Sequence, residues 1–280
     1  MPYCCKILSR QTNVKIKHLY HISDIHIRNQ NRHDEYRQVF ENLYVRLREV
    51  SHYKGEKTNS GLIVITGDIV HSKSQISPQL IIELRDFFTN LCQIMPVLFI
   101  AGNHDLTLNN KTIPDTLSSI MHRMDIPNLH YLKESGFYVW NNIVFTVMSV
   151  IDYPLIKASE MGEEFAGLTK IVLLHATLYG SRISCSSRPM EGDKYKVADF
   201  NGYDYVLLGD IHLHQYLNSA KTIAYAGSLV QQNFGETLYG HGYLDWNLED
   251  GTSKLVEIEN NYCYTNFIYK RNKMILTNDE

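Results

Sequence analysis

Two kinds of hydrophobic pattern alternate along the chain. Unbroken apolar runs are typical of buried strands, and they occur within residues 62–68, 96–102, 170–175 and 205–209. Residues 17–24 form an apolar-rich run that ends in a carboxylate and predict a first strand. Elsewhere apolar residues recur at every third or fourth position, which predicts helices over residues 34–50, 77–92 and 112–124. Ser77 followed by Pro78 has the residue types that favour a helix N-terminus. Strands that alternate with helices predict an α/β sandwich.

The pattern of apolar and polar residues changes after residue 128. Short β-rich pieces up to residue 151 are separated by Gly136 and by Asn141-Asn142, which predicts a second, more antiparallel half. A polar loop follows over residues 178–193. Later segments predict a strand at 222–226, a hairpin of 242–248 with 255–259, and one further strand in the tail after residue 260.

Composition narrows the class of protein. The 280 residues are enough for one large domain, alone or with a small appendage. With 44% hydrophobic and 20% charged residues, the chain is not typical of a disordered protein. A net charge of −3 is not typical of a protein that coats nucleic acid with a broadly basic surface. Five scattered cysteines indicate reduced thiols in an intracellular protein, and the sequence predicts no membrane segment.

Candidate chemistry follows the predicted strands. In sheets of this kind ligands bind beyond the carboxyl ends of the strands, and this is where polar motifs recur. The motifs are Asp24-Ile25-His26, Gly67-Asp68 with His71, Gly102-Asn103-His104-Asp105, a lone His175, and Gly209-Asp210-Ile211-His212-Leu213-His214. Each motif alone has a structural explanation, such as a turn or a core histidine. Together, in this order, they predict a two-metal site.

The ligand types indicate which metals suit the site. Asp24 and His26 lie two residues apart, so both side chains point the same way in an extended segment. Asp68 has two oxygens with which to bridge two cations. The remaining predicted ligands are the amide of Asn103 and the imidazoles of His175, His212 and His214. Mixed oxygen and nitrogen ligands without thiolate favour manganese, iron or zinc. Two divalent ions against two carboxylates leave a charge of roughly +2, which attracts phosphate.

Three further residues are candidates for catalysis itself. His104 is predicted to protonate the leaving oxygen as a general acid. Asp105, its neighbour, is predicted to tune its basicity. His71 lies three residues past Asp68 and is predicted to reach the substrate from the same loop.

The order of these motifs resembles the calcineurin-like metallophosphoesterase superfamily over residues 17–260. Within it, the sequence resembles SbcD-type nucleases of DNA double-strand-break repair. Three details carry that finer resemblance: the Asp34–Phe40 helix start, His71 where protein phosphatases continue with Asp-Arg-Gly, and Gln215 followed by the segment Tyr225–Leu229. The resemblance implies two central mixed sheets flanked by helices, with a nuclease domain over residues 1–262.

The resemblance also implies roles. One metal would be bound by Asp24, His26, Asp68 and His214, and the second by Asp68, Asn103, His175 and His212. His104 resembles the histidine that stabilises the transition state, and His71 the one that positions DNA. The family uses Mn²⁺, digests DNA 3′ to 5′ and nicks single strands. Its partners are an SMC/Rad-type ATPase and a second copy of the chain, here through the helices at 34–50 and 77–92.

The sequence also departs from the family pattern. Relatives continue into a DNA-capping domain, of which residues 263–280 are expected to be the start. Asp210 stands where many relatives have His or another residue after the glycine. Contacts to DNA are expected from polar loop residues, namely Arg28, Asn29, Arg32, Arg182 and Arg188. The alternatives to a nuclease are a phosphatase or small-molecule phosphodiesterase with the same metals, and a scaffold without catalysis.

Overall fold

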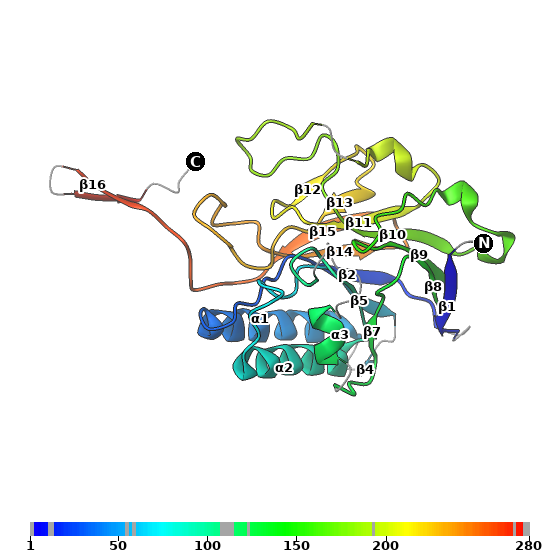
Figure 1. Ribbon diagram of the computed structural model, residues 1–280, viewed down its shortest axis with the longest axis horizontal. Coiled ribbons are helices and arrows are strands. Elements are labelled where there is room, and N and C mark those ends of the chain that lie inside the picture. Colours follow the sequence, from blue (N-terminus) through cyan, green and yellow to red (C-terminus); the bar gives the residue numbers. More distant parts are fainter. Residues whose placement is uncertain are drawn as a thin grey trace.

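The computed structural model describes residues 3–10, 14–53, 56–57, 60–106, 115–121, 124–191, 194–270 and 273–276. Two sheets lie face to face and two long helices cover the outer face of one of them (Figure 1). The helices are α1 (His33–Ser51) and α2 (Pro78–Ile94), and a short helix α3 (Thr116–Met121) lies beside them. The predicted α/β sandwich of two mixed sheets is therefore confirmed.

The six-stranded sheet carries the first three motifs. Its order is β15-β14-β2-β5-β6-β7, in which β2, β5, β6 and β7 run parallel, while β14 is antiparallel to β2 and to β15. The bounds are β2 (His18–Ile22), β5 (Gly61–Thr66), β6 (Val97–Ile100), β7 (Leu129–Tyr131), β14 (Gly242–Asn247) and β15 (Thr252–Glu257).

The seven-stranded sheet carries the later motifs. Its order is β1-β8-β9-β10-β11-β13-β12. The bounds are β1 (Cys4–Ser9), β8 (Gly136–Trp140), β9 (Ile143–Met148), β10 (Thr169–His175), β11 (Tyr205–Gly209), β12 (Gln215–Tyr216) and β13 (Ile223–Tyr225). The prediction of a more antiparallel half is wrong for most of this sheet, because β9, β10, β11 and β13 pair in parallel. Only β8 with β9 and β12 with β13 form antiparallel pairs within it.

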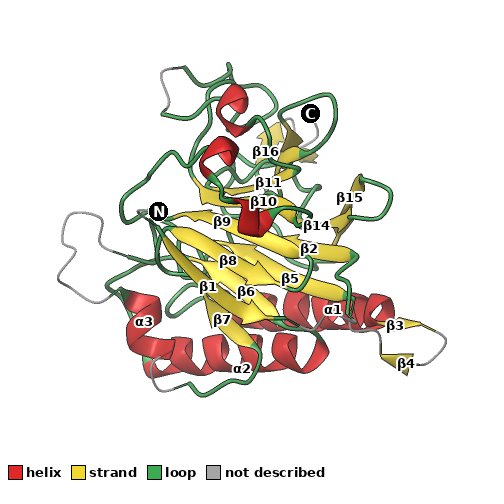
Figure 2. Cartoon of the chain, turned by 90° about the vertical axis from the view of Figure 1, so that its right-hand side faces the viewer, coloured by secondary structure: helices red, strands yellow, loops and turns green. Residues whose placement is uncertain are grey.

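The unbroken apolar runs are explained by burial on both faces. Strand side chains point alternately to opposite faces. In β5, Ile63 and Ile65 face the helices, whereas Leu62 and Val64 face the other sheet. The seven-stranded sheet is likewise covered on its outer face by loops and three short 3₁₀ helices, at Ala158–Glu160, Glu163–Phe165 and Val197–Phe200 (Figure 2).

The elements outside the two sheets are small. The second helix begins as predicted, with Ser77 Oγ accepting the N–H of Leu80. The predicted helix over residues 112–124 is confirmed only as α3, since residues 112–114 and 122–123 lie outside the described residues. The tail forms a hairpin of β16 (Phe267–Lys270) and β17 (Lys273–Leu276), and it extends away from the sheets (Figure 1). A further small hairpin pairs β3 (His52–Tyr53) with β4 (Glu56–Lys57). Among the described residues, no helix combines the length and apolarity that crossing a bilayer requires.

Candidate metal centre

The carboxyl ends of strands from both sheets meet at one edge of the sandwich. Two hydrogen bonds tie them together there. His175 Nδ1 at the end of β10 donates to the carbonyl oxygen of Thr66 at the end of β5 (2.7 Å), and the N–H of Asp210 donates to the carboxylate of Asp24 (3.2 Å). The polar side chains gathered at this edge are Asp24, His26, Asp68, Asn103, His104, His175, Asp210 and His212.

One group of atoms surrounds His175. A carbonyl oxygen only accepts hydrogen bonds, so Nδ1 of His175 carries the ring proton and Nε2 of the neutral ring presents a lone pair. That Nε2 faces three oxygens, at 3.0 Å from Asn103 Oδ1, 3.4 Å from Asp68 Oδ1 and 3.8 Å from Asp210 Oδ1. When the ring is neutral, its Nε2 and these three oxygens are four neighbouring acceptor atoms, and a cation among them would offset their charge.

A second group lies beside the first and shares Asp68. His212 Nδ1 donates to Glu236 Oε1 (2.7 Å), which leaves its Nε2 as an acceptor 3.0 Å from His26 Nε2. The same nitrogen of His26 lies 3.5 Å from Asp68 Oδ2, and His212 Nε2 lies 3.8 Å from Asp24 Oδ1. Two imidazole nitrogens and two carboxylates thus face one another.

Both groups fit divalent cations. The ligand atoms of Asp24, His26 and His212 lie within 4.8 Å of one another, and so do those of Asp24, Asp68 and His175. Asp24 and Asp68 are almost fully buried. Buried carboxylates need a counter-charge, and the mixed oxygen and nitrogen donors suit a divalent transition metal.

The pKa shifts of the buried side chains also indicate that positive charge is favoured at the site. Burial raises the pKa of Asp24 to about 6. Burial also raises the pKa of Asp68, but His175 and His26 outweigh it and hold the pKa below its ordinary value. For His175 burial lowers the pKa, and the charges of Asp68, Asp24 and Asp210 more than reverse this, so that the pKa is raised well above the usual 6.5.

The backbone at the strand ends is bent into an unusual conformation. Asp24, His26 and Asp68 have φ values of 50°, 51° and 51°, and Asp210 has 95°. Residues other than glycine rarely adopt positive φ, and such strain clusters at functional sites. Three glycines allow the strand ends to approach: a Cβ would lie 2.1 Å from Asp68 Oδ1 at Gly102, 2.1 Å from Thr66 O at Gly209, and 2.6 Å from His175 Nδ1 at Gly67.

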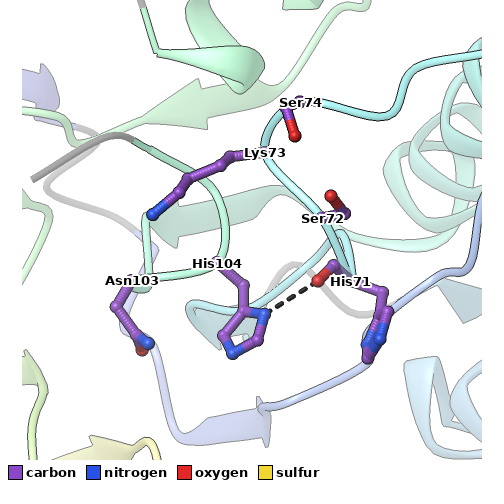
Figure 3. A pocket seen from close by; sticks show the side chains of 6 residues that line it. All are labelled: His71, Ser72, Lys73, Ser74, Asn103 and His104. Carbon is purple, nitrogen blue, oxygen red and sulfur yellow. Dashed lines mark hydrogen bonds between the residues drawn. The ribbon is translucent and has the colours of Figure 1, made fainter.

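A pocket of about 280 Å³ opens beside these two groups (Figure 3). It is lined by His71, Ser72, Lys73, Ser74, Asn103 and His104, and none of these six described residues carries a carboxylate. His104 Nδ1 donates to the carbonyl oxygen of His71 (2.8 Å), so Nε2 is the nitrogen left for other partners. The ligand atoms of His26, His71 and His104 lie within 4.8 Å of one another, which places both predicted catalytic histidines at the site.

The structure corrects one predicted ligand. His214 Nδ1 donates to the carbonyl oxygen of Tyr225 (2.9 Å), its ring packs on Tyr216, and among the described residues it belongs to none of the groups of ligand atoms within 4.8 Å of one another. His212, expected at the second metal, faces His26 and Asp24 of the first. The position beside His175 is occupied by Asp210, which sequence reasoning treated only as a departure.

Asp105 is also corrected. Its buried carboxylate accepts the backbone N–H groups of Ile69, Val70 and Gly102 at 2.9–3.0 Å. These bonds join the loop after β5 to the loop after β6, so Asp105 holds the loops that carry Asp68 and Asn103. It was expected to tune the basicity of His104, but the imidazole Nδ1 of His104 bonds to the carbonyl oxygen of His71.

Sequence reasoning missed Glu236. Besides His212, its carboxylate accepts the N–H of Gln232 (2.8 Å) and the side chain of Asn233 (2.8 Å). For Glu236 burial raises the pKa, but the bond to His212 lowers it overall. A carboxylate bonded to the far nitrogen of a ligand histidine is a frequent arrangement in metal sites. The residue lies 24 positions from its partner, and no local spacing signals the contact.

The expected DNA-contact residues separate into two groups. Arg32 is paired with Glu35 (2.6 Å) and donates to Gln231 O (2.6 Å), and the side chain of Asn29 accepts the N–H of Ser77 (2.7 Å), so both hold loops in place. Their expected contact with DNA stays a prediction. The other three candidates are Arg28 near His71, which donates to Gln232 O (3.2 Å), Arg182, which is exposed and donates to Ser187 O (3.0 Å), and the exposed Arg188.

The two-sheet fold and the neighbouring groups of oxygen and nitrogen donors define an α/β domain of the metallophosphoesterase type. The chain matches the family model for calcineurin-like phosphoesterases over residues 17–214, and it belongs to that family. Its relatives include uncharacterized protein R555 of Acanthamoeba polyphaga mimivirus. That protein is 44% identical over 265 residues, which cover 92% of this chain and 19% of the relative.

A nuclease is among the more distant relatives. The SbcD component of nuclease SbcCD from Staphylococcus saprophyticus is 27% identical over 230 residues, 74% of this chain and 57% of the relative. Among solved structures, Pseudomonas putida nuclease MPE is 15% identical, with 57% of this chain and 62% of that chain covered and a TM-score of 0.31. The chain spans about one fifth of the viral relative and somewhat over half of the SbcD relative.

Proposed function

We propose that this protein is a DNA nuclease that cuts phosphodiester bonds with two divalent cations. The cation that we propose is Mn²⁺. The observation that carries the proposal is the convergence of acceptor atoms around His175 and around His26, with Asp68 shared between them. The likeness to a subunit of a nuclease supports a nucleic acid as the substrate. In line with the resemblance, we propose 3′–5′ exonuclease and single-strand endonuclease activity in the repair of double-strand breaks.

The pocket supports a phosphate chain as the substrate. Its polar side chains are hydroxyls, an ammonium group, an amide and imidazoles, all of which can donate hydrogen bonds. In Figure 3 the Lys73 side chain reaches across toward Asn103 and His104. A phosphate next to the one that is cut could accept hydrogen bonds from these side chains. None of the six described lining residues carries a negative charge that would repel it.

The chain's own residues then hold the substrate and move one proton. Two divalent cations bound at the site would supply a water of lowered pKa and stabilise the attacking and leaving oxygens. His104 is held by its bond to His71 O and by its own N–H, which donates to Asp68 Oδ1 (2.9 Å). Its Nε2 would protonate the leaving oxygen, a role that contributes about 10²- to 10⁴-fold.

The same proposal includes partners. The SbcD relative is by name one subunit of a larger nuclease, and we propose an SMC/Rad-type ATPase as the partner here. We also propose a homodimer through α1 and α2, where Val45, Val50, Ile81 and Ile82 are 39–48% exposed. All five cysteines are unpaired, which supports a reducing intracellular compartment.

The test is cleavage of linear double-stranded and single-stranded DNA by the purified protein. Reactions contain Mn²⁺, Mg²⁺ or EDTA, and a small chromogenic diester is tested in parallel. We expect cutting of DNA with Mn²⁺, loss in EDTA, and a fall of about 10²- to 10⁴-fold in the His104→Ala variant. Hydrolysis of the small diester without cutting of DNA would refute the nuclease and support a small-molecule phosphodiesterase.

A further inference from the structure

The segment from Gly209 to Gln215 offers two pairs of side chains at the same spacing. Asp210 with His212 and His212 with His214 are both two residues apart. In the structure, the first pair faces the histidines of the metal centre. Asp210 Oδ1 lies 3.8 Å from His175 Nε2, and His212 Nε2 lies 3.0 Å from His26 Nε2. His214 instead donates to the carbonyl oxygen of Tyr225.

Asp210 is held in place through both its side chain and its backbone. Thr177 Oγ1 donates to Oδ2 of Asp210 (2.5 Å), and this contact leaves Oδ1 facing His175. The N–H of Asp210 donates to the Asp24 carboxylate, which belongs to the neighbouring group. The φ of 95° is a conformation that side-chain-bearing residues rarely adopt, and these contacts maintain it.

We infer that Asp210 is a ligand of the cation beside His175 and makes this site richer in oxygen than its neighbour. The donors there would be one oxygen each from Asp68, Asn103 and Asp210 with a single nitrogen from His175. The carboxylate of Asp24 lies near both sites, because its ligand atom is within 4.8 Å of those of Asp68 and His175. The neighbouring site has two nitrogens, from His26 and His212, with the oxygens of Asp24 and Asp68.

This composition determines which cation the site prefers. Carboxylate and amide oxygens suit Mg²⁺ and Mn²⁺, whereas imidazole suits zinc, copper and nickel. A site that has the carboxylate of Asp210 in place of an imidazole therefore favours Mn²⁺ or Mg²⁺ over Zn²⁺. It also brings the carboxylates around the two sites to three, which lowers the positive charge of a centre loaded with two cations. The inference rests on the metal-dependent part of the proposed function, and the identity of the substrate does not enter it.

The test measures metal binding directly, with no substrate present. The chain is stripped with EDTA, and the chelator is removed. The protein is then titrated with Mn²⁺, while electron paramagnetic resonance records the free ion. We expect two bound ions in the wild type. Asp210→Asn keeps the size of the side chain, and we expect it to weaken one ion at least about tenfold while the other is bound as before.

Two further variants sharpen the comparison. We expect His214→Ala to bind both ions with wild-type affinity, because this ring is directed at Tyr225. We expect Asp210→His to bind two ions and to prefer Zn²⁺ over Mn²⁺ more strongly than the wild type in competition titrations. The melting temperature of each stripped variant shows whether it is folded before metal is added.

The possible outcomes distinguish a failure of this inference from a failure of the proposed nuclease function. Unchanged Mn²⁺ binding in Asp210→Asn, or loss of an ion in His214→Ala, would overturn the inference. Loss of one ion in Asp210→Asn together with a wild-type protein that cuts no DNA would uphold the inference and refute the nuclease. A wild type that binds no Mn²⁺ would refute both.

Discussion

Replacing Gly209 by alanine tests how closely the two sheets must approach to build the site. Gly209 ends β11, and a Cβ added there would lie 2.1 Å from the carbonyl oxygen of Thr66 and 2.7 Å from His175 Nδ1. Both are inside normal contact distance, and the nearer atom belongs to the backbone. The strand ends would have to separate, and the 2.7 Å hydrogen bond from His175 to Thr66 would break.

The loss of stability follows from these two effects. Overpacking a well-packed interior costs about 1–3 kcal/mol. A buried donor that loses its acceptor costs about 1–3 kcal/mol more. The sum is about 2–6 kcal/mol, a large part of the roughly 5–15 kcal/mol that holds a folded domain together.

Urea unfolding of the metal-free protein measures this loss. Both tryptophans, Trp140 and Trp246, are buried in the core between the sheets and report unfolding by fluorescence. Two glycines provide matched controls. At Gly235 a Cβ would meet only the side chain of Asn233, at 3.0 Å, and at Gly180 it would meet nothing within 4 Å although φ is +88°. Gly235→Ala should change little, and Gly180→Ala should cost about 1–2 kcal/mol from its backbone conformation alone. If Gly209→Ala loses no more than these controls, the steric reasoning is wrong.

Two further predictions concern single contacts. Glu236→Ala frees the ring of His212, and we expect Mn²⁺ affinity to fall about 10- to 100-fold in calorimetric titration; an unchanged affinity would show that Glu236 does not orient the ring. The hydrogen bond of His18 to Asp245 (2.9 Å) raises the pKa of His18. This stabilisation is full below pH 6.5 and is lost as pH rises through the higher folded-state pKa. His18→Gln should therefore lose about 0.5–1 kcal/mol at pH 5.5 and less at pH 9, as read from melting temperatures; an equal loss at both would contradict the assignment.

Much of the fold was predictable because both faces of the central strands are buried. That burial produced the unbroken apolar runs at 62–68, 96–102, 170–175 and 205–209, and their carboxyl ends located the site. The direction of the later strands was not predictable. The turn at Asn141-Asn142 correctly indicates the β8–β9 hairpin, but the parallel pairing of β9, β10 and β11 depends on contacts between distant segments.

The error at His214 has a physical origin. In an extended segment, residues two apart point to the same side, so Asp210, His212 and His214 have equivalent spacing in the sequence. The choice among them depends on where Gly209 is placed against Thr66, which is a contact between the two sheets. The partners of Arg32, Asp105 and Glu236 are likewise set by loops that meet only in the folded chain.

The positive φ values explain why the site lies where the strands stop. A strand that continued would send successive side chains to opposite faces, and its ligands would be separated by the sheet. At Asp24, His26, Asp68 and Asp210 the chain turns sharply instead, so that side chains from both sheets are directed at one point. Each such residue costs roughly 1–3 kcal/mol and persists only where its surroundings fix it. Here the surroundings are the same contacts that join the sheets, so the packing of the sandwich and the geometry of the metal centre depend on one another.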